Sequence, residues 1–260
     1  EEDIVAAEHE RHPEFHESQV RAPASYWDRW REECDLADAI IVNSEWSNRA
    51  LAEAGVSGDH VRVVPLAYAP PGLTPEVRVS NAFTEERPLR VLYLGTLTLR
   101  KGLARLLKAA EQVQDAPVEF WIVGGGTVNV PDRHQQHSNV QWIGHVPRSQ
   151  VGTYYRDADL FLFPTLTDGF GLTQLEAQAY GLPVLASERC GDVVEDGHNG
   201  LRLGDVTPET IADALRRIAS HPDDLRRMAR NSRDTLDAFR PDVVADALIR
   251  AVRAASPNMQ

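Results

Sequence analysis

Two acidic residues flank a glycine-rich turn in the segment DGFGLTQLEAQAYG, with seven residues between Asp168 and Glu176. Gly169 and Gly171 let the backbone approach a ligand closely, and the first N–H groups of a helix can bind an anion. We expect a phosphate seat made by the backbone of Phe170, Gly171, Leu172 and Thr173. One carboxylate then lies on each side of the phosphates and accepts hydrogen bonds from hydroxyl groups. A ligand with hydroxyls on both sides of a diphosphate is a nucleotide sugar, so the segment predicts a site for one.

A second segment, VLYLGTLTLRKGLARLL, supplies positive charge. It predicts a strand, a turn at Gly95 that Thr96 follows, and a helix that begins near Arg100. Arginine offers a planar fork to phosphate oxygens, and lysine offers a point charge. We therefore expect Arg100 and Lys101 to reach the same crevice as the acidic segment and to stabilise the charge on a departing diphosphate.

From residue 90 onward, short β-rich runs alternate with amphipathic helical stretches. This alternation is typical of βαβ units, so the sequence predicts an α/β fold with a doubly wound, mostly parallel, Rossmann-like sheet. The expected strands are 90–95, 118–124, 140–144, 159–164, 183–187 and 200–203. Ligands bind at the carboxyl ends of the strands in such a sheet, and both segments follow predicted strands.

The composition limits the class of partner and site. The net charge is −12, with acids and bases mixed along the chain, which argues against nucleic acid as a partner. Cys34 and Cys190 are the only cysteines and have no histidine cluster nearby, so we expect neither a disulfide framework nor a metal site. No apolar run is long enough for a transmembrane segment. A reducing cytoplasmic location fits these features best.

The stretch from about Ala22 to Val252 resembles the later part of a retaining GT-B glycosyltransferase of family 4, also called group 1. The family's acid-x7-acid pattern before A-x-A-x-G-x-P-V is matched by Asp168, Glu176 and AQAYGLPVLAS. Its Lys-Gly pair after a glycine turn is matched by Lys101 and Gly102. GDVVEDGHNGLRL and LADAIIVNSEWSNRALAEAGV are also similar to segments of the family.

This resemblance implies the donor site of a two-domain enzyme, with a UDP- or GDP-linked sugar as donor, an unknown acceptor and no cofactor. Glu176 would hold the ribose hydroxyls and Asp168 would contact the transferred hexose. Lys101 and Arg100 would serve the diphosphate, which makes them the expected catalytic residues together with Asp168. In the family, transfer retains the anomeric configuration without a metal. Asp168 stands where the family usually has Glu, and Thr96 stands where Arg commonly follows the glycine, which leaves Arg100 as a substitute.

The resemblance also implies how the chain is divided. We expect residues 1–70 to be the end of an incomplete acceptor-side domain, because two short strands there cannot form a doubly wound domain alone. Residues 71–88 are rich in Pro, Gly and polar residues and are expected to be a linker. Residues 89–240 would form the donor-binding domain, and 241–260 a helix that packs back on the front piece. The missing N-terminal domain, or a partner chain, would complete the molecule.

Simpler explanations stay open from the residues alone. Asp168 could only cap a helix, and Arg100 could be a surface charge. The alternative function is a donor-fold module that binds a nucleotide or a partner chain without catalysing transfer. His134 and His137 are expected to be solvated, and His145 to be a polar loop residue at the same sheet edge as the phosphate loops.

Overall fold

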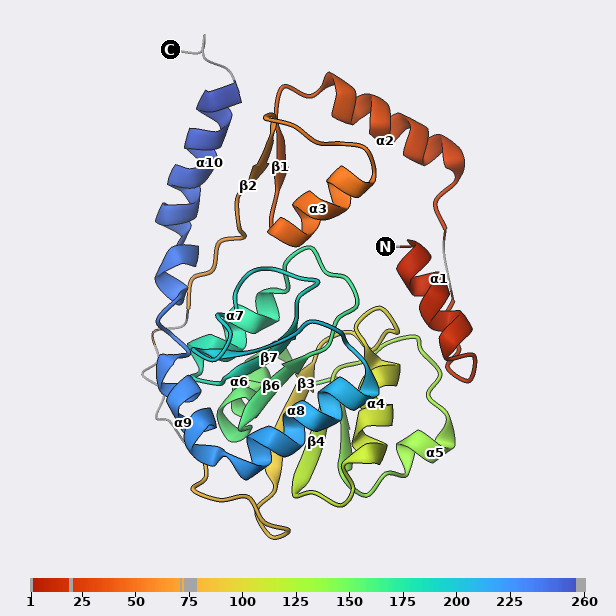
Figure 1. Ribbon diagram of the computed structural model, residues 1–260, viewed down its shortest axis with the longest axis vertical. Coiled ribbons are helices and arrows are strands. Elements are labelled where there is room, and N and C mark those ends of the chain that lie inside the picture. The colour runs from red at the N-terminus through yellow and green to blue at the C-terminus, as the bar shows by residue number, and fades with distance from the viewer. Residues whose placement is uncertain (1, 19–20, 71, 73–78, 256–260) are drawn as a thin grey trace.

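The computed structural model of the chain describes residues 2–18, 21–70, 72 and 79–255, and its largest element is a six-stranded sheet (Figure 1). In their order across the sheet the strands are β5 (Val140–Gly144), β4 (Val118–Val123), β3 (Leu89–Leu94), β6 (Leu160–Phe163), β7 (Val184–Ser187) and β8 (Gly200–Leu203). All neighbouring strands are parallel. Each strand lies within one residue of a predicted run, so the predicted α/β fold is confirmed.

The strand order reverses in the middle of the sheet. From β3 the chain adds β4 and β5 toward one edge, and it then returns to place β6 beside β3 and adds β7 and β8 toward the other edge. The loops that follow β3 and β6 therefore leave neighbouring strands at the same sheet edge, which is where open α/β sheets bind ligands. These are the two loops that carry the predicted chemistry.

Helices cover both faces of the sheet, as a doubly wound fold requires. One face carries α4 (Leu103–Gln112) and α8 (Pro208–Ser220), and the other carries α6 (Arg148–Asp157) and α7 (Leu172–Ala179). Successive residues of β3 alternate between the two layers: Val91 and Tyr93 lie in the first core and Leu92 in the second. The short elements α5 (Asp132–Gln135), α9 (Pro222–Asn231) and η1 (Leu236–Phe239) complete this part of the molecule.

A smaller layer lies beside the large sheet (Figure 1). It contains the parallel pair β1 (Ile40–Val42) and β2 (Val61–Val63), with α2 (Ala24–Leu36), α3 (Glu45–Glu53) and the last helix, α10 (Pro241–Ala255). Val244 and Ala251 of α10 form a buried cluster with Val64, directly after β2. The C-terminal helix therefore covers the strand end of the small layer.

The first helix, α1 (Glu2–Arg11), packs on the large sheet layer and not on β1 and β2. Glu8 accepts a hydrogen bond from Arg105 Nε of α4 at 2.8 Å, and Phe15 is 1% exposed in the same core as α4. Burial raises the pKa of Glu8, but hydrogen bonds from Arg105 and His12 outweigh burial and lower it to about 2. Residues 2–17 thus lie apart from the strands with which the sequence groups them. The domain boundaries themselves stay a prediction, and the expected linker falls partly outside the described residues.

Candidate functional site

The loop between β3 and α4 brings Lys101 close to the neighbouring loop. Gly102 precedes α4 with a φ of 78°, and a Cβ atom there would overlap the carbonyl oxygen of Pro164, directly after β6. Only glycine combines this φ with such a close approach. Gly102 therefore lets the two loops touch, and Lys101 is placed at their contact.

The loop between β6 and α7 positions Asp168. Its Oδ1 accepts the Phe170 N–H at 3.1 Å, and α7 begins after Gly171, which has a φ of 84° and provides no side-chain cap. One of the four amides that the sequence assigns to an anion is therefore already bonded to Asp168. The Phe170 ring is buried against Phe239, and its carbonyl oxygen accepts the Gly191 N–H at 2.9 Å, so Phe170 is engaged within the protein.

The two loops meet at an ion pair. Lys101 Nζ binds Asp168 Oδ2, and Lys101 Nζ also lies 5.1 Å from the centre of the Phe163 ring. The side chains of Lys101 and Asp168 are only 20% and 14% exposed. The structure therefore brings the cationic loop and the amide-bearing loop together, with the lysine charge neutralised by the aspartate.

Arg100 binds the backbone of the Asp168 loop. Its Nη1 donates to the Thr167 carbonyl oxygen at 2.9 Å, and its side chain lines a separate cavity of about 400 Å³ with Tyr26 and Trp27 of α2. Arg100 and Lys101 are consecutive, but Arg100 binds a backbone carbonyl oxygen and Lys101 binds the Asp168 carboxylate. The expectation that both basic groups reach the same crevice stays a prediction.

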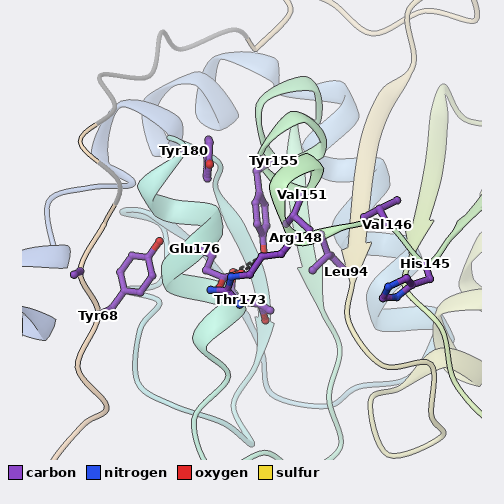
Figure 2. Close-up of a pocket in the computed structure, with 12 residues that line it drawn as sticks. Tyr68, Leu94, His145, Val146, Arg148, Val151, Tyr155, Thr173, Glu176 and Tyr180 are labelled. Carbon is purple, nitrogen blue, oxygen red and sulfur yellow. Dashed lines mark hydrogen bonds and ion pairs between the residues drawn. The ribbon is translucent and has the colours of Figure 1, made fainter.

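A larger cavity, of about 760 Å³, lies beside α7 (Figure 2). Thr173 and Glu176 of α7, both predicted site residues, line it. His145 lines it too, and most of the other lining residues are ones that the sequence does not single out, including Tyr68, Arg148, Val151, Tyr155 and Tyr180. An adjoining cavity of about 270 Å³ shares Leu94, His145, Val146 and Val151 with it and adds Gly95 and Thr96. Four of the predicted site residues therefore line the two adjoining cavities: Gly95, Thr96, Thr173 and Glu176. Lys101 and Asp168 line neither of them.

Glu176 is the acid of the larger cavity, and its two oxygens have different surroundings. Oε2 accepts the Tyr155 hydroxyl at 3.0 Å, and Oε1 lies 3.6 Å from Arg148 Nη2 (Figure 2). Burial and the neighbouring Glu176 charge raise the pKa of Tyr155 well above its usual value. Burial, and then Glu176, raise the pKa of Tyr68 to about 12. Both tyrosines therefore stay neutral hydrogen-bond donors at ordinary pH.

Among the cavity residues that the sequence analysis does not name, Arg148 could have been predicted from its position in the sequence. It begins α6 four residues after β5 ends, so it leaves the same sheet edge as the two predicted loops. Tyr155 had no such signal, because it lies in the interior of α6 and meets Glu176 only through the packing of α6 on α7.

The start of α3 rests on the Asp168 loop. Trp46 Nε1 donates to Thr167 Oγ1 at 3.1 Å, and Ser47 Oγ lies 3.4 Å from the Gly169 carbonyl oxygen. The Glu45 N–H donates to Asp192 Oδ2 at 3.2 Å. The small layer is thus in direct polar contact with the loop that holds Asp168.

One group of potential metal ligands is found in the described part of the chain: Glu111, His134 and His137, with ligand atoms all within 4.8 Å of one another. His134 is 1% exposed and stacks on Phe15, so the expectation that it is solvated is wrong. Burial lowers the pKa of His134, followed by the charges of Arg133 and His137. This group shares no residue with the cavity beside α7. Separately, none of the described helices is both long and apolar enough to cross a membrane.

Comparison with known proteins identifies the family. The family model of the group 1 glycosyl transferases matches residues 88–221, about half of the chain. A D-inositol 3-phosphate glycosyltransferase of Kribbella flavida is 28% identical over 173 residues, which cover 62% of this chain and 41% of that protein. The chain spans about half the length of the curated relatives it matches.

Two solved structures share the fold. Sucrose-phosphate synthase of Thermosynechococcus elongatus superposes with a TM-score of 0.72 at 22% identity, over 97% of this chain and 67% of that one. HepE of Anabaena, in complex with UDP, superposes with a TM-score of 0.65 at 17% identity, over 84% of this chain and 64% of that one. Both have the GT-B architecture to which the sequence is similar. The chain therefore belongs to the group 1 glycosyltransferases.

Proposed function

We propose that this chain forms the donor-binding half of a glycosyltransferase that transfers a hexose from a nucleoside diphosphate to an acceptor hydroxyl. The observation that carries the proposal is the arrangement at one sheet edge. Lys101 meets Asp168 there, in the loop that leads into α7, and Glu176, in the second turn of α7, faces a cavity of about 760 Å³. Cavities of this size are typical for ligands as large as a nucleotide sugar.

The residues divide the ligand between them. Lys101 and the backbone amides of Gly171, Leu172 and Thr173 would bind the diphosphate, since a helix N-terminus and an ammonium group both favour negative charge. Glu176 would accept hydrogen bonds from the ribose, and Asp168 from the hexose. Lys101 is paired with Asp168. A donor phosphate would replace Asp168 as the partner of Lys101 and leave Asp168 free for sugar hydroxyls.

In the reaction, the bond between the anomeric carbon and the diphosphate oxygen breaks, and the acceptor oxygen bonds to the same carbon. The acceptor proton passes to the departing phosphate, whose charge Lys101 and the α7 amides stabilise. Retention and independence from a metal rest on the family resemblance. The acceptor would be bound by the part of the enzyme beyond this chain, or by a partner chain.

Calorimetry tests the proposal, with UDP, GDP and their glucose-linked forms as ligands. We expect one of the two nucleotides to bind the unmodified chain, and Glu176→Ala to weaken that binding by about tenfold or more. Glu209→Ala is the matched control, because Glu209 binds Gln112 at the far end of α4. Slow hydrolysis of the matching nucleotide sugar, measured by released nucleotide, would report the transfer chemistry. If neither nucleotide bound, the donor-site assignment would be wrong.

A further inference from the structure

Tyr155 has a fixed position between α6 and α7. Its side chain is 2% exposed, and its ring stacks on Tyr180 with centres 5.5 Å apart and planes at 19°. On another side it meets the edge of Phe161 at 5.8 Å. Because neighbours hold the ring on two sides, the direction of its hydroxyl is set by packing and not by the ligand.

The hydroxyl of Tyr155 is directed at the acid of the cavity. It donates to Glu176 Oε2 at 3.0 Å, while the next acceptor, the Thr173 carbonyl oxygen, is at 3.5 Å. A phenol has one proton, so the shorter contact with the charged acceptor is the bond that forms. Tyr155 therefore fixes one oxygen of the Glu176 carboxylate.

The other oxygen of Glu176 is left for a ligand. Oε1 has Arg148 Nη2 at 3.6 Å, which is longer than a hydrogen bond, and the Arg148 side chain is 94% exposed. Such an exposed pair contributes little and can separate readily. The carboxylate thus presents one oxygen that is held by a buried tyrosine and one that faces the cavity with an easily displaced partner.

We propose that Tyr155 is a positioning residue that orients Glu176 toward the ribose of a nucleoside diphosphate and thereby makes the site selective for ribonucleotides over deoxyribonucleotides. This inference rests on the proposed function, because it needs the ribose to lie at Glu176. A site built to bind a hydroxyl discriminates strongly against a ligand that lacks it, since the buried acceptor is then left without a donor. The discrimination depends on the carboxylate being held in one orientation before the ligand arrives.

The raised pKa of Tyr155 is consistent with this role. A neutral phenol donates a hydrogen bond to a carboxylate, whereas an ionised one would repel it. Tyr155 therefore stays a hydrogen-bond donor over the pH range of an ordinary binding assay.

The test compares UDP with 2′-deoxy-UDP, or GDP with 2′-deoxy-GDP if GDP is the nucleotide that binds, by calorimetry in the unmodified chain and in Tyr155→Phe. Phenylalanine keeps the ring and its packing and removes only the hydroxyl. We expect the unmodified chain to bind UDP about tenfold more tightly than 2′-deoxy-UDP. In Tyr155→Phe this ratio should fall to about threefold or less, with the Kd of 2′-deoxy-UDP unchanged within about twofold. If Tyr155→Phe kept the full ratio, Tyr155 would only fill the core and the proposal would be overturned.

Two further variants separate positioning from general damage. Tyr154→Phe is the matched control, because Tyr154 precedes Tyr155 on α6 and packs edge-on against Trp121 away from the cavity lining. It should leave the ratio as in the unmodified chain. Glu176→Gln should abolish most of the ratio, and adding Tyr155→Phe to it should change the ratio no further, since both residues then act through the same lost carboxylate.

The outcomes also distinguish this inference from the proposed function. If the unmodified chain bound UDP without any preference over 2′-deoxy-UDP, the ribose would not lie at Glu176 and the inference would be overturned. A diphosphate site at Lys101 would be compatible with that result. Absence of UDP and GDP binding altogether would contradict both.

Discussion

The two acids of the site, eight positions apart in the chain, are held in opposite ways. Glu176 is bonded on one oxygen by the neutral Tyr155 hydroxyl, and its other oxygen faces a cavity of about 760 Å³. Asp168 is bonded on both oxygens, by the Phe170 N–H and by Lys101 Nζ, and it lies outside the lining of that cavity. One acid is therefore ready for a ligand, and the other is engaged within the protein.

This difference suggests how binding would proceed. A group held by a neutral donor keeps its charge available to a ligand, so the Glu176 end needs no rearrangement before binding. A group held in an ion pair must exchange its partner first. We therefore expect Glu176 to determine the affinity for the nucleotide. Asp168 is expected to change its partner when the diphosphate and the sugar bind. Variants at the contacts of each acid test this contrast.

The largest effect is expected where the two loops touch. Gly102→Ala places a Cβ against the Pro164 carbonyl oxygen in a left-handed backbone conformation. Overpacking and backbone strain together should lower the free energy of unfolding by about 3 kcal/mol, measured by urea denaturation. Gly55→Ala is the control, because its φ is 88° but nothing lies within 4 Å of the added atom. It should lose only about 1 kcal/mol. Equal losses in the two variants would mean that the loops do not depend on this contact.

Removing the Lys101 side chain should weaken diphosphate binding without changing the contacts of Glu176. Lys101→Ala is expected to weaken UDP binding by about 30-fold, since a charge-assisted bond to phosphate is lost. The preference for UDP over 2′-deoxy-UDP should persist, because Glu176 is untouched. Lys108→Ala, in which the removed ammonium group pairs with Glu14 at 3.0 Å, is the control for charge. Calorimetry that finds unchanged UDP affinity in Lys101→Ala would contradict the diphosphate assignment.

The contact between α3 and the Asp168 loop has a smaller expected effect. Trp46→Phe keeps an aromatic ring and removes the Nε1–H that bonds Thr167 Oγ1. Loss of one neutral hydrogen bond should lower the free energy of unfolding by about 1 kcal/mol. The control is Trp30→Phe, where the ring meets the edge of Trp27 at 5.9 Å on α2. A Trp46→Phe chain as stable as the control would show that the small layer does not support the loop.

The smallest expected effect also has the opposite sign. Asp168→Asn releases Lys101 from its ion pair, so UDP should bind about two- to fivefold more tightly. Hydrolysis of the nucleotide sugar should slow in the same variant, because a hydrogen-bond acceptor for the hexose is weakened. Tighter UDP binding would be measured by calorimetry, and weaker binding would mean that Asp168 contacts the nucleotide directly.

The sheet and the meeting of the two loops could be predicted from the sequence for a physical reason. Continuous apolar runs identify buried parallel strands, and the doubly wound order places β3 beside β6. Asp168 and Lys101 follow those two strands, so backbone topology alone brings them together. The proximity of the two loops therefore follows from the backbone, whereas the ion pair between the two side chains is not part of the prediction.

What could not be predicted depends on side-chain packing between elements that are distant in the sequence. Arg100 follows the same strand as Lys101, but its guanidinium turns to the Thr167 carbonyl. His134 has polar neighbours along the chain, and its burial comes from Phe15, which is brought to it by α1. Tyr155 meets Glu176 across two helices. Periodicity reports which face of an element is apolar, but it does not report which partner that face meets.

The place where the small layer joins the large sheet has a mechanical consequence for the two acids. The Tyr68 N–H donates to the Phe239 carbonyl oxygen at 2.7 Å, which ties together two passages of the chain, and the Tyr68 side chain borders the cavity near Glu176. If the small layer swings about this tie, points near the pivot barely move and distant points sweep furthest. During such a rotation we expect the part of the site around Glu176 to keep its shape. The start of α3 would then separate from the Asp168 loop.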